Sequence, residues 1–346
     1  MRLGVLDVGS NTAHLLVADA GGGLPLPVHA KKTKLRLAER VNKTGTLSAG
    51  AIDRLATAVA GAVGHARNWA VQELFGYATA AVRDAPNRDA ALAAVRERAG
   101  IELGLLDGAE EAELTFLAAR RWMGWRAGPL LLLDIGGGSL EIAYGHDVAP
   151  DFAVSLPLGA GRLTRERLSG DPPSQRQVRS LRDHVRAQLE EVAVRLHWER
   201  RGTVVATSRT FHQLARLCGA PARKEGPFVP RMLRRADLKV QMDRLARMSE
   251  AQRARLPGIS APRARQSLAG AIVAHSAMAM LGLREVQVCP WALREGVLLR
   301  RVESTDAWTD RALRLGVHPP RPAAPSPPPS GRAALHLVDQ GQTQVV

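Results

Sequence analysis

Aromatic residues are scarce in this chain, and cysteine is rarer still. Phe, Trp and Tyr make up 4% of the 346 residues, and there are two cysteines. Proteins that bind single-stranded nucleic acid stack bases on aromatic side chains, so this scarcity argues against a nucleic-acid partner. Cys218 and Cys289 form no CxxC pair, which argues against both a disulfide framework and a structural zinc site.

Long apolar segments are also lacking. No run of about 18 apolar residues occurs, and the longest uncharged stretch, residues 268–283, contains a histidine and is too short to span a bilayer. That stretch predicts a buried helix. Asp7 follows Arg2 so closely that no apolar segment of a signal peptide fits between them. We therefore expect no membrane association and a cytoplasmic location.

Acidic residues are too few to balance the basic ones. The chain has 48 Lys and Arg against 33 Asp and Glu, which gives a formal charge of +15. A strong excess of one sign attracts partners of the other sign. The composition thus favours an anionic ligand, and the shortage of aromatic side chains favours one without stacking bases.

The hydrophobic pattern alternates between strands and helices. It predicts two strands joined by a glycine-containing turn over residues 2–19, a helix over 48–70, a strand over 74–77 and a helix over 88–99. The opening unit then recurs as strand 130–134, turn 136–139 and strand 141–144. One constant shift along the chain places Asp7 on Asp134, Gly9 on Gly136 and Thr12 on Ser139. This repeat predicts two similar domains that face each other.

The second half continues the α/β pattern. Ser174 is the expected cap of a helix, residues 203–206 predict a strand, 211–218 a helix, and 221–235 a loop rich in proline and basic residues. The periodicity ends near residue 304, where prolines become frequent. We predict domains over residues 1–124 and 125–303 and a proline-rich disordered tail over 304–346.

The two repeated turns are candidate phosphate-binding loops. Glycine allows the backbone N–H groups to approach an anion closely, and hydroxyl groups add further donors. A single turn of this kind is usually structural, but two equivalent turns, each preceded by an aspartate, favour phosphate binding between the domains. The candidate phosphate ligands in the two turns are Gly9, Ser10, Asn11, Thr12, Gly136, Gly137, Gly138 and Ser139.

Acidic residues next to these turns cannot bind phosphate directly, because like charges repel. Asp7, Asp134 and Glu141 are instead candidates to ligate Mg²⁺ or Mn²⁺, or else they brace the neighbouring loops. Residues 108–113 (GAEEAE) add three carboxylates in what reads as the first turn of a helix. Acidic residues are expected there from the helix dipole alone.

Six motifs in order along residues 1–303 resemble the exopolyphosphatase/guanosine-pentaphosphate phosphohydrolase (Ppx/GppA) family, especially its shorter members of actinobacterial type. The motifs are 6–12 (LDVGSNT), 78–83 (ATAAVR), 108–112 (GAEEA), 133–141 (LDIGGGSLE), 158–162 (LGAGR) and 291–296 (WALREG). The resemblance implies an α/β fold of the actin-like ATPase (ribonuclease H-like) type, with two related domains and the active cleft between them.

The resemblance also assigns roles to single residues. It implies that Glu111 is the general base for water and that Arg83 grips a phosphate. One departure is at residues 207–210 (TSRT), where relatives have a glycine-rich turn. Arg209 adds bulk at the place where related ATPases receive adenosine, so Ser208 and Arg209 are predicted to contact a phosphate chain instead. The Asp183-His184 pair lies in an ordinary amphipathic helix and predicts no second metal centre.

Several functions are open at this point. The first is release of terminal phosphate from inorganic polyphosphate; the second is removal of the 5′-terminal phosphate of guanosine pentaphosphate; the third is a noncatalytic sensor of either ligand. A sugar kinase of the same fold is disfavoured by the altered turn at Arg209. The sequence leaves a homodimer open. Basic residues that favour a long anion channel are Arg162, Arg165, Arg167, Arg223, Lys224, Arg231, Arg234 and Arg235.

Overall fold

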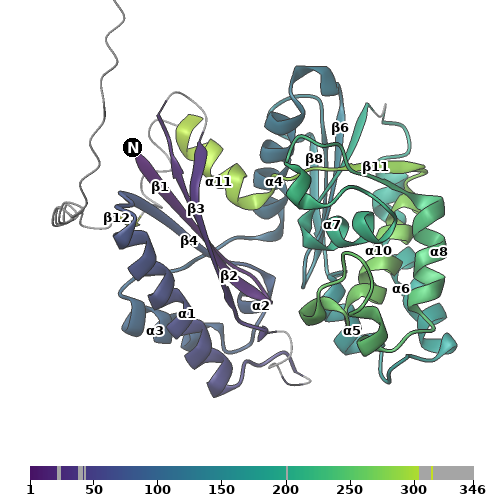
Figure 1. Cartoon of the computed structure of the whole chain (residues 1–346), viewed down its shortest axis with the longest axis horizontal. Coiled ribbons are helices and arrows are strands. Elements are labelled where there is room, and N and C mark those ends of the chain that lie inside the picture. The colour runs from purple at the N-terminus through teal and green to yellow at the C-terminus, as the bar shows by residue number, and fades with distance from the viewer. Residues whose placement is uncertain (22–24, 38–41, 43, 200–201, 304–312, 315–346) are drawn as a thin grey trace, which may run out of the picture.

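The protein consists of two α/β halves that lie side by side, with two helices at their junction (Figure 1). The structure is a computed structural model, and it describes residues 1–21, 25–37, 42, 44–199, 202–303 and 313–314. Most of the tail predicted over residues 304–346 therefore lies outside the described residues. Within that range, β12 (Leu313–Arg314) pairs antiparallel with β4 (Glu73–Ala78) of the first half.

The first half is built on a sheet with the strand order β12-β4-β1-β2-β3, and β5 pairs with β4. Antiparallel pairing joins β1 to β2 and β2 to β3, whereas β4 runs parallel to β1. The remaining strands are β1 (Arg2–Val8), β2 (Thr12–Asp19), β3 (Leu26–Lys34) and β5 (Gly104–Leu105). The helices of this half are α1 (Ala49–Asn68), α2 (Ala80–Arg83) and α3 (Arg88–Ala99).

The second half repeats this plan. Its sheet has the order β10-β11-β9-β6-β7-β8, with β6, β7 and β8 antiparallel in sequence and β9 parallel to β6. Both sheets thus have three consecutive antiparallel strands with a parallel strand beside the first, which confirms the predicted actin-like architecture. The strands are β6 (Leu130–Ile135), β7 (Leu140–Gly145), β8 (Phe152–Leu156), β9 (Thr203–Thr207), β10 (Met232–Arg234) and β11 (Glu285–Val288).

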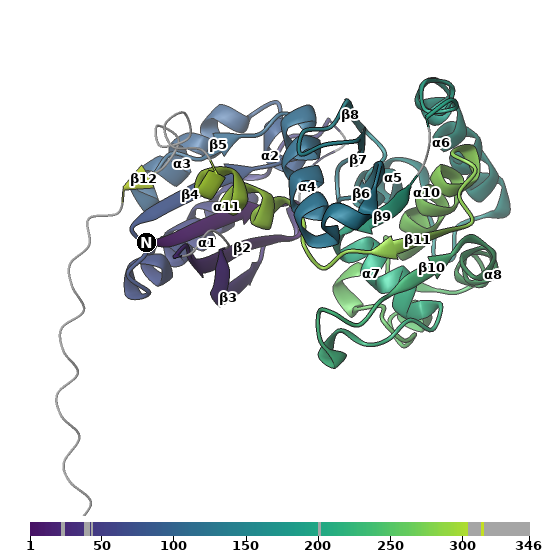
Figure 2. The ribbon, with the colours of Figure 1, turned by 90° about the horizontal axis from the view of Figure 1, so that it is seen from above.

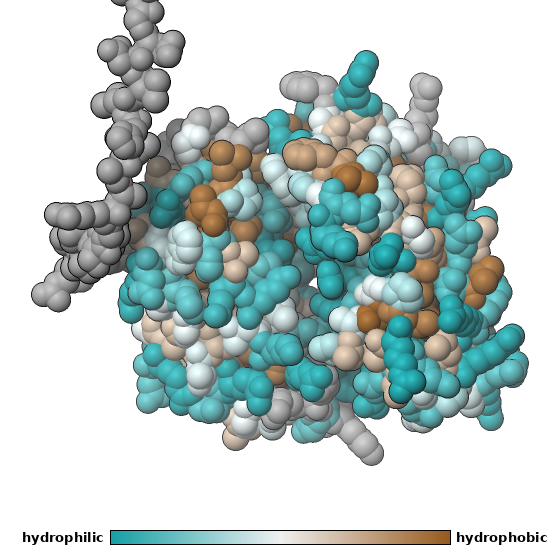
Figure 3. Space-filling model, in the orientation of Figure 1, coloured by the Kyte–Doolittle hydropathy of each residue, from teal (hydrophilic) through white to brown (hydrophobic). Residues whose placement is uncertain are grey.

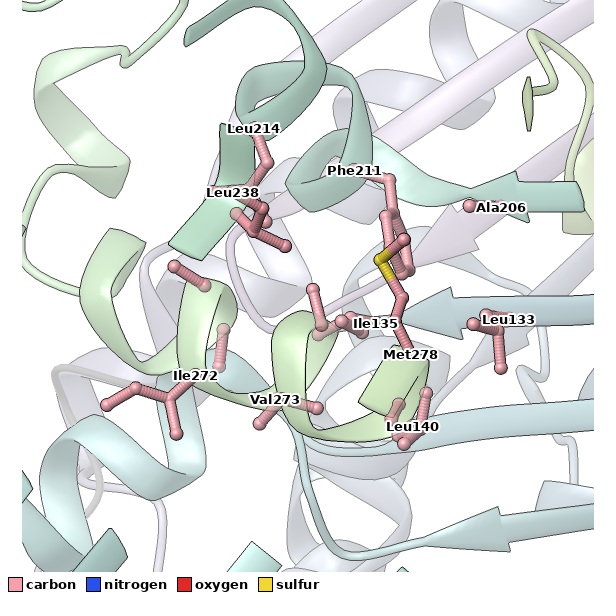
Figure 4. Packing of buried hydrophobic residues seen from close by; sticks show 14 of the residues in the cluster. Leu133, Ile135, Leu140, Ala206, Phe211, Leu214, Leu238, Ile272, Val273 and Met278 are labelled. Atoms are coloured by element: carbon pink, nitrogen blue, oxygen red, sulfur yellow. The ribbon is translucent and has the colours of Figure 1, made fainter. Parts of the chain in front are cut away.

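Helices of the second half pack on its sheet around one large apolar core. Residues of α10 (Ser267–Met280) are almost all buried there, as predicted for the uncharged stretch. Figure 4 shows Ile272 and Met278 of this helix in the same core as Leu133 and Phe211. Ser174 caps α6 through a capping box, also as predicted. The other helices are α5 (Ala160–Arg167), α6 (Gln175–Arg195), α7 (Ser208–Leu217), α8 (Arg235–Leu245) and α9 (Glu250–Arg253).

Two local predictions differ from the structure. The helix predicted from residue 211 begins earlier, at Ser208, because Thr207 ends β9 and the chain turns directly into α7. The predicted loop over 221–235 contains a short 3₁₀ helix, Arg223–Glu225, and then β10. Only β10 arises from pairing with a distant strand, β11, which local composition does not report.

The two cysteines do not pair with each other. Cys218 and Cys289 are free thiols, and burial raises the pKa of Cys218 to about 12, so that thiol stays protonated near neutral pH. Among the described residues, no helix is both long and apolar enough to cross a bilayer.

The junction of the two halves is formed by α4 (Gly108–Met123) and α11 (Leu293–Glu303). Leu114 of α4 packs with Val297 of α11 against the first sheet, whereas Phe116 of α4 packs into the second half. The helices cross so closely that a β-carbon at Gly296 would lie 1.9 Å from the carbonyl oxygen of Leu114. Figure 2 shows α4 between the two halves, and Glu111 lies in the first turn of this helix.

This crossing predicts that Gly296→Ala is destabilising. The added methyl group must push α4 and α11 apart, and overpacking of this kind costs about 1–3 kcal/mol. Gly61→Ala in α1 is the matched control, because nothing lies within 4 Å of a β-carbon there and alanine is the better helix former. Thermal unfolding should show a lower midpoint for Gly296→Ala and an equal or higher one for Gly61→Ala. Equal midpoints for Gly296→Ala and wild type would contradict the close crossing.

Candidate active site

The first sheet places three polar residues in one row at the end that faces the junction. The strand registers pair Asp7 with His14 and His14 with Lys32, so these side chains stand side by side on one face. The first glycine-containing turn starts immediately after β1, where Gly9 N donates to Thr12 O at 3.0 Å. The row of Asp7, His14 and Lys32 therefore lies next to the first candidate phosphate loop.

The second sheet holds the equivalent row. Its registers pair Thr207 with Asp134, Asp134 with Glu141 and Glu141 with Ser155. Thr207 Oγ1 donates to Asp134 Oδ2 at 2.5 Å, and Ser155 Oγ donates to Glu141 Oε1 at 2.9 Å. The constant shift that superposes the repeats places Glu141 on His14. The first half therefore has a histidine, His14, at the position where the second half has the carboxylate of Glu141.

The two candidate phosphate loops meet across the junction. A β-carbon at Gly137 would lie 1.8 Å from Ser10 Oγ, and one at Gly138 would lie 2.7 Å from Ala80 Cβ. Glycine is therefore needed at both positions for the halves to approach this closely. Asn11 Nδ2 donates to Ser10 Oγ at 3.4 Å, which braces the first loop. The structure thus brings together the turns that the sequence placed far apart.

Glu111 and Arg83 approach this junction from α4 and α2. Arg83 Nη1 lies 3.8 Å from Glu111 Oε2 and donates to the carbonyl oxygen of Leu106 at 2.9 Å. The side chain of Glu111 is 16% exposed, and its Oε2 has no hydrogen-bond partner among the described residues. Asp107 caps α4 by accepting from Glu110 N, as expected for a helix that begins at this motif. A carboxylate oxygen held unpartnered in this way is available to accept a proton.

The four carboxylates at the junction disfavour one another's ionisation. Burial, then the charges of Glu141, Asp7 and Asp134, raises the pKa of Glu111 well above its usual range. Burial and Asp134 raise the pKa of Glu141 to about 7, and burial with Asp7 raises that of Asp134 to about 6. Burial also raises the pKa of Asp7, against the opposing charge of Arg294. Burial, with mutual repulsion at three of them, thus raises the pKa of all four carboxylates at the junction.

Such a set of hard oxygen donors fits a divalent cation. No group of three His, Cys, Asp or Glu side chains in the described parts of the chain lies close enough to form a complete metal cage. Mg²⁺ commonly uses one or two carboxylates and completes its shell with water and substrate phosphate. The predicted ligands Asp7, Asp134 and Glu141 would therefore need water and a phosphate ligand to complete the shell.

Basic residues from both halves gather beside these carboxylates, and we call them the cation cluster. Burial, followed by the charges of the other members, lowers the pKa of Lys32, and burial with Arg209 lowers that of Arg263 to about 10. Arg294 Nη1 forms an ion pair with Asp7 Oδ2 at 3.0 Å, which fixes the cluster next to the first sheet. The members are Lys32, Arg209, Arg223, Arg263 and Arg294.

Sequence reasoning identified only part of this cluster. Arg209 and Arg223 were predicted to contact an anion, and Ser208 stands beside Arg209 at the start of α7 with a positive φ of 79°. Lys32, Arg263 and Arg294 were missed. Arg294 lies in the WALREG motif, which was the available signal, whereas Lys32 reaches the site only through the pairing of β2 with β3.

The predicted anion channel is wrong at Arg231. That side chain is 4% exposed, and its guanidinium donates to the carbonyl oxygens of residues 221, 222, 226 and 229, so it holds the surrounding loop together. Arg234 pairs in register with Glu285 at the start of β11, and Arg235 follows it. The site lies at the opposite end of that sheet, near Val288 and Thr207. Arg234 and Arg235 as channel residues stay a prediction.

Two α/β halves share the same order of four core strands, and their glycine-containing turns meet at the junction. This arrangement defines an α/β protein of the actin-like fold. A family model described as the Ppx/GppA phosphatase family matches residues 16–305, and the chain belongs to that family.

Relatives of the chain agree with this assignment. The chain is 56% identical to an uncharacterised protein of Streptomyces coelicolor over 93% of this chain and 97% of the relative. It is 48% identical to exopolyphosphatase 1 of Mycobacterium tuberculosis over 92% of this chain and 93% of that protein.

Solved structures agree on the fold. An exopolyphosphatase from Cytophaga hutchinsonii matches with a TM-score of 0.80 at 23% identity and covers 88% of this chain and 98% of its own. A Ppx/GppA family member from Aquifex aeolicus matches with a TM-score of 0.73 at 24% identity over 87% of this chain and 97% of its own.

The carboxylate arrangement predicts that Asp134→Asn raises the Mg²⁺ concentration needed for half-maximal phosphatase activity. The amide keeps the hydrogen bond from Thr207 possible but removes the negative charge that attracts the ion. Asp183→Asn, an exposed carboxylate in α6, is the control and should leave the requirement unchanged. A metal titration with a phosphate-release assay measures both. Full wild-type activity in excess chelator would refute the metal site.

Proposed function

We propose that the protein is an exopolyphosphatase that releases terminal orthophosphate from inorganic polyphosphate. The observation that carries this proposal is the position of the cation cluster, which lies beside the buried carboxylates and draws residues from both halves. A chain of phosphates that leaves the paired glycine-rich loops would meet these cations next. The exopolyphosphatases among the relatives and solved structures support the same reaction.

In this proposal, the two loops hold the terminal phosphate. Backbone N–H groups of residues 10–12 and 137–139, with the Ser10 hydroxyl, would donate to its oxygens, because the N–H groups of Gly9 and Gly136 already close the two turns. Asp7, Asp134 and Glu141 would hold Mg²⁺ or Mn²⁺, which supplies charge neutralisation for the phosphate oxygens when bound. Arg83, whose Nη1 lies 3.8 Å from Glu111 Oε2, would also contact this phosphate.

Glu111 would act as the general base. Its unpartnered Oε2 accepts the proton of a water molecule as that water oxygen attacks the terminal phosphorus, and the bond from phosphorus to the bridging oxygen breaks. The products are orthophosphate and a chain shorter by one phosphate. Because α4 is packed into both halves, the carboxylate keeps its position relative to both phosphate loops.

The cation cluster also bears on which substrate is preferred. The sequence predicts that Arg209 adds bulk where related ATPases receive adenosine, and burial with Arg209 as a neighbour lowers the pKa of Arg223. Such mutual repulsion among cations is relieved by several phosphates rather than by a neutral base. Polyphosphate therefore fits this region better than guanosine pentaphosphate. This proposal also predicts a cytoplasmic location and Mg²⁺ or Mn²⁺ as the metal. It leaves a homodimer open.

The role of the base predicts the effect of Glu111→Gln. The amide keeps the size of the side chain but cannot accept the proton, so kcat for polyphosphate should fall by about 10²–10⁴-fold with little change in KM. Glu110→Gln, one residue earlier in the same helix turn, is the matched control and should keep most of the activity. Phosphate release measured over a range of polyphosphate concentrations separates kcat from KM. Near wild-type turnover in Glu111→Gln would show that another group is the base.

A further inference from the structure

Asp84 bridges the two halves of the molecule through both of its carboxylate oxygens. Oδ1 accepts from Arg83 Nε at 2.9 Å, and Oδ2 accepts from Arg162 Nη2 at 2.6 Å. Arg83 and Asp84 end α2 of the first half, whereas Arg162 belongs to α5 of the second half. One carboxylate therefore binds one guanidinium from each side of the junction.

Each end of this bridge is anchored to one of the two phosphate loops. On the second half, Arg162 N donates to the carbonyl oxygen of Gly137 at 2.9 Å, inside the second loop. On the first half, α2 follows Thr79, whose N–H donates to the carbonyl oxygen of Val8 at 3.1 Å, directly before the first loop. Asp84 thus links the supports of the two loops. A cavity of about 60 Å³ lies beside the link, between the loops, α2 and α5.

The same bridge orients Arg83 toward the proposed base. The guanidinium of Arg83 uses Nε for Asp84 and Nη1 for the carbonyl oxygen of Leu106, and Nη1 is then 3.8 Å from Glu111 Oε2. These contacts leave the group little freedom to rotate. If the halves separated and Arg162 left Asp84, the carboxylate that orients Arg83 would lose its second partner.

We propose that Asp84 is a positioning residue, which couples the approach of the two halves to the orientation of Arg83 beside Glu111. The inference rests on the proposed function, since it concerns the same hydrolysis. The three side chains keep 18% to 34% of their surface exposed, and ion pairs of that exposure contribute little to folding. A change at Asp84 should therefore appear in turnover rather than in thermal stability.

Asp84→Asn tests the coupling, with polyphosphate as substrate and orthophosphate release as the readout. We expect kcat to fall by about 10–100-fold, because small displacements of catalytic groups have effects of this size. KM should stay equal or become lower, because Arg83 and Arg162 lose the negative charge that neutralises them. Asp84→Glu, which keeps two acceptor oxygens, should restore most of the turnover.

Arg162→Met supplies the second arm of the test. It breaks the same bridge from the other side, so it should lower kcat as well, and the double variant Asp84→Asn/Arg162→Met should lose little more than the worse single variant. The Asp53–Arg98 pair, which joins α1 to α3 within the first half, provides the matched control. Asp53→Asn and Arg98→Met remove one charge each and should leave kcat unchanged.

The outcomes separate this inference from the proposed function. If the wild type releases no phosphate from polyphosphate, the proposed function fails. If the wild type is active and Asp84→Asn has wild-type kcat, or if the effects of Asp84→Asn and Arg162→Met multiply in the double variant, the coupling is wrong. A parallel fall of the unfolding midpoint in Asp84→Asn, with no recovery in Asp84→Glu, would also overturn it.

Discussion

Repulsion among buried carboxylates is the constraint on which the rest of this structure depends. Asp7, Asp134, Glu141 and Glu111 are desolvated and raise one another's pKa values at the junction of the two halves. Folding alone would favour neutral side chains there. Hydrogen bonds from Thr207 and Ser155, and the ion pair from Arg294, offset part of the cost of burying these carboxylates. A cation and a phosphate ligand would complete the charge balance.

The duplicated fold explains how these charges are brought together. Each half ends its first strand with an aspartate and a glycine-containing turn, and the close contact of Gly137 with Ser10 places the two turns against each other. The halves then differ where the chemistry requires a difference: Glu141 stands in the second half where His14 stands in the first. Figure 3 shows hydrophilic side chains along the boundary of the halves.

Sequence reasoning found the local parts of this arrangement and missed the nonlocal ones. The loops around Asp7 and Asp134 were predictable because strand, turn and acidic residue are contiguous in the chain. Lys32 and Arg263 were not, because strand pairing and helix packing bring them to the site from distant positions. The prediction for Arg231 was wrong for a different reason. Its neighbours in the sequence are basic, but its guanidinium donates hydrogen bonds to four backbone carbonyl groups. Amino-acid composition does not show whether the carbonyl groups of a loop bind a basic side chain of that same loop.

The measurement that tests the account most directly is orthophosphate release by the wild type from long-chain polyphosphate and from guanosine pentaphosphate, each at low and high salt. A polyanion that contacts several members of the cation cluster displaces more counterions than a nucleotide does. The account predicts a higher kcat/KM for polyphosphate and a steeper fall of that value with salt. A higher kcat/KM for the nucleotide, or an equal salt dependence for both substrates, would contradict it.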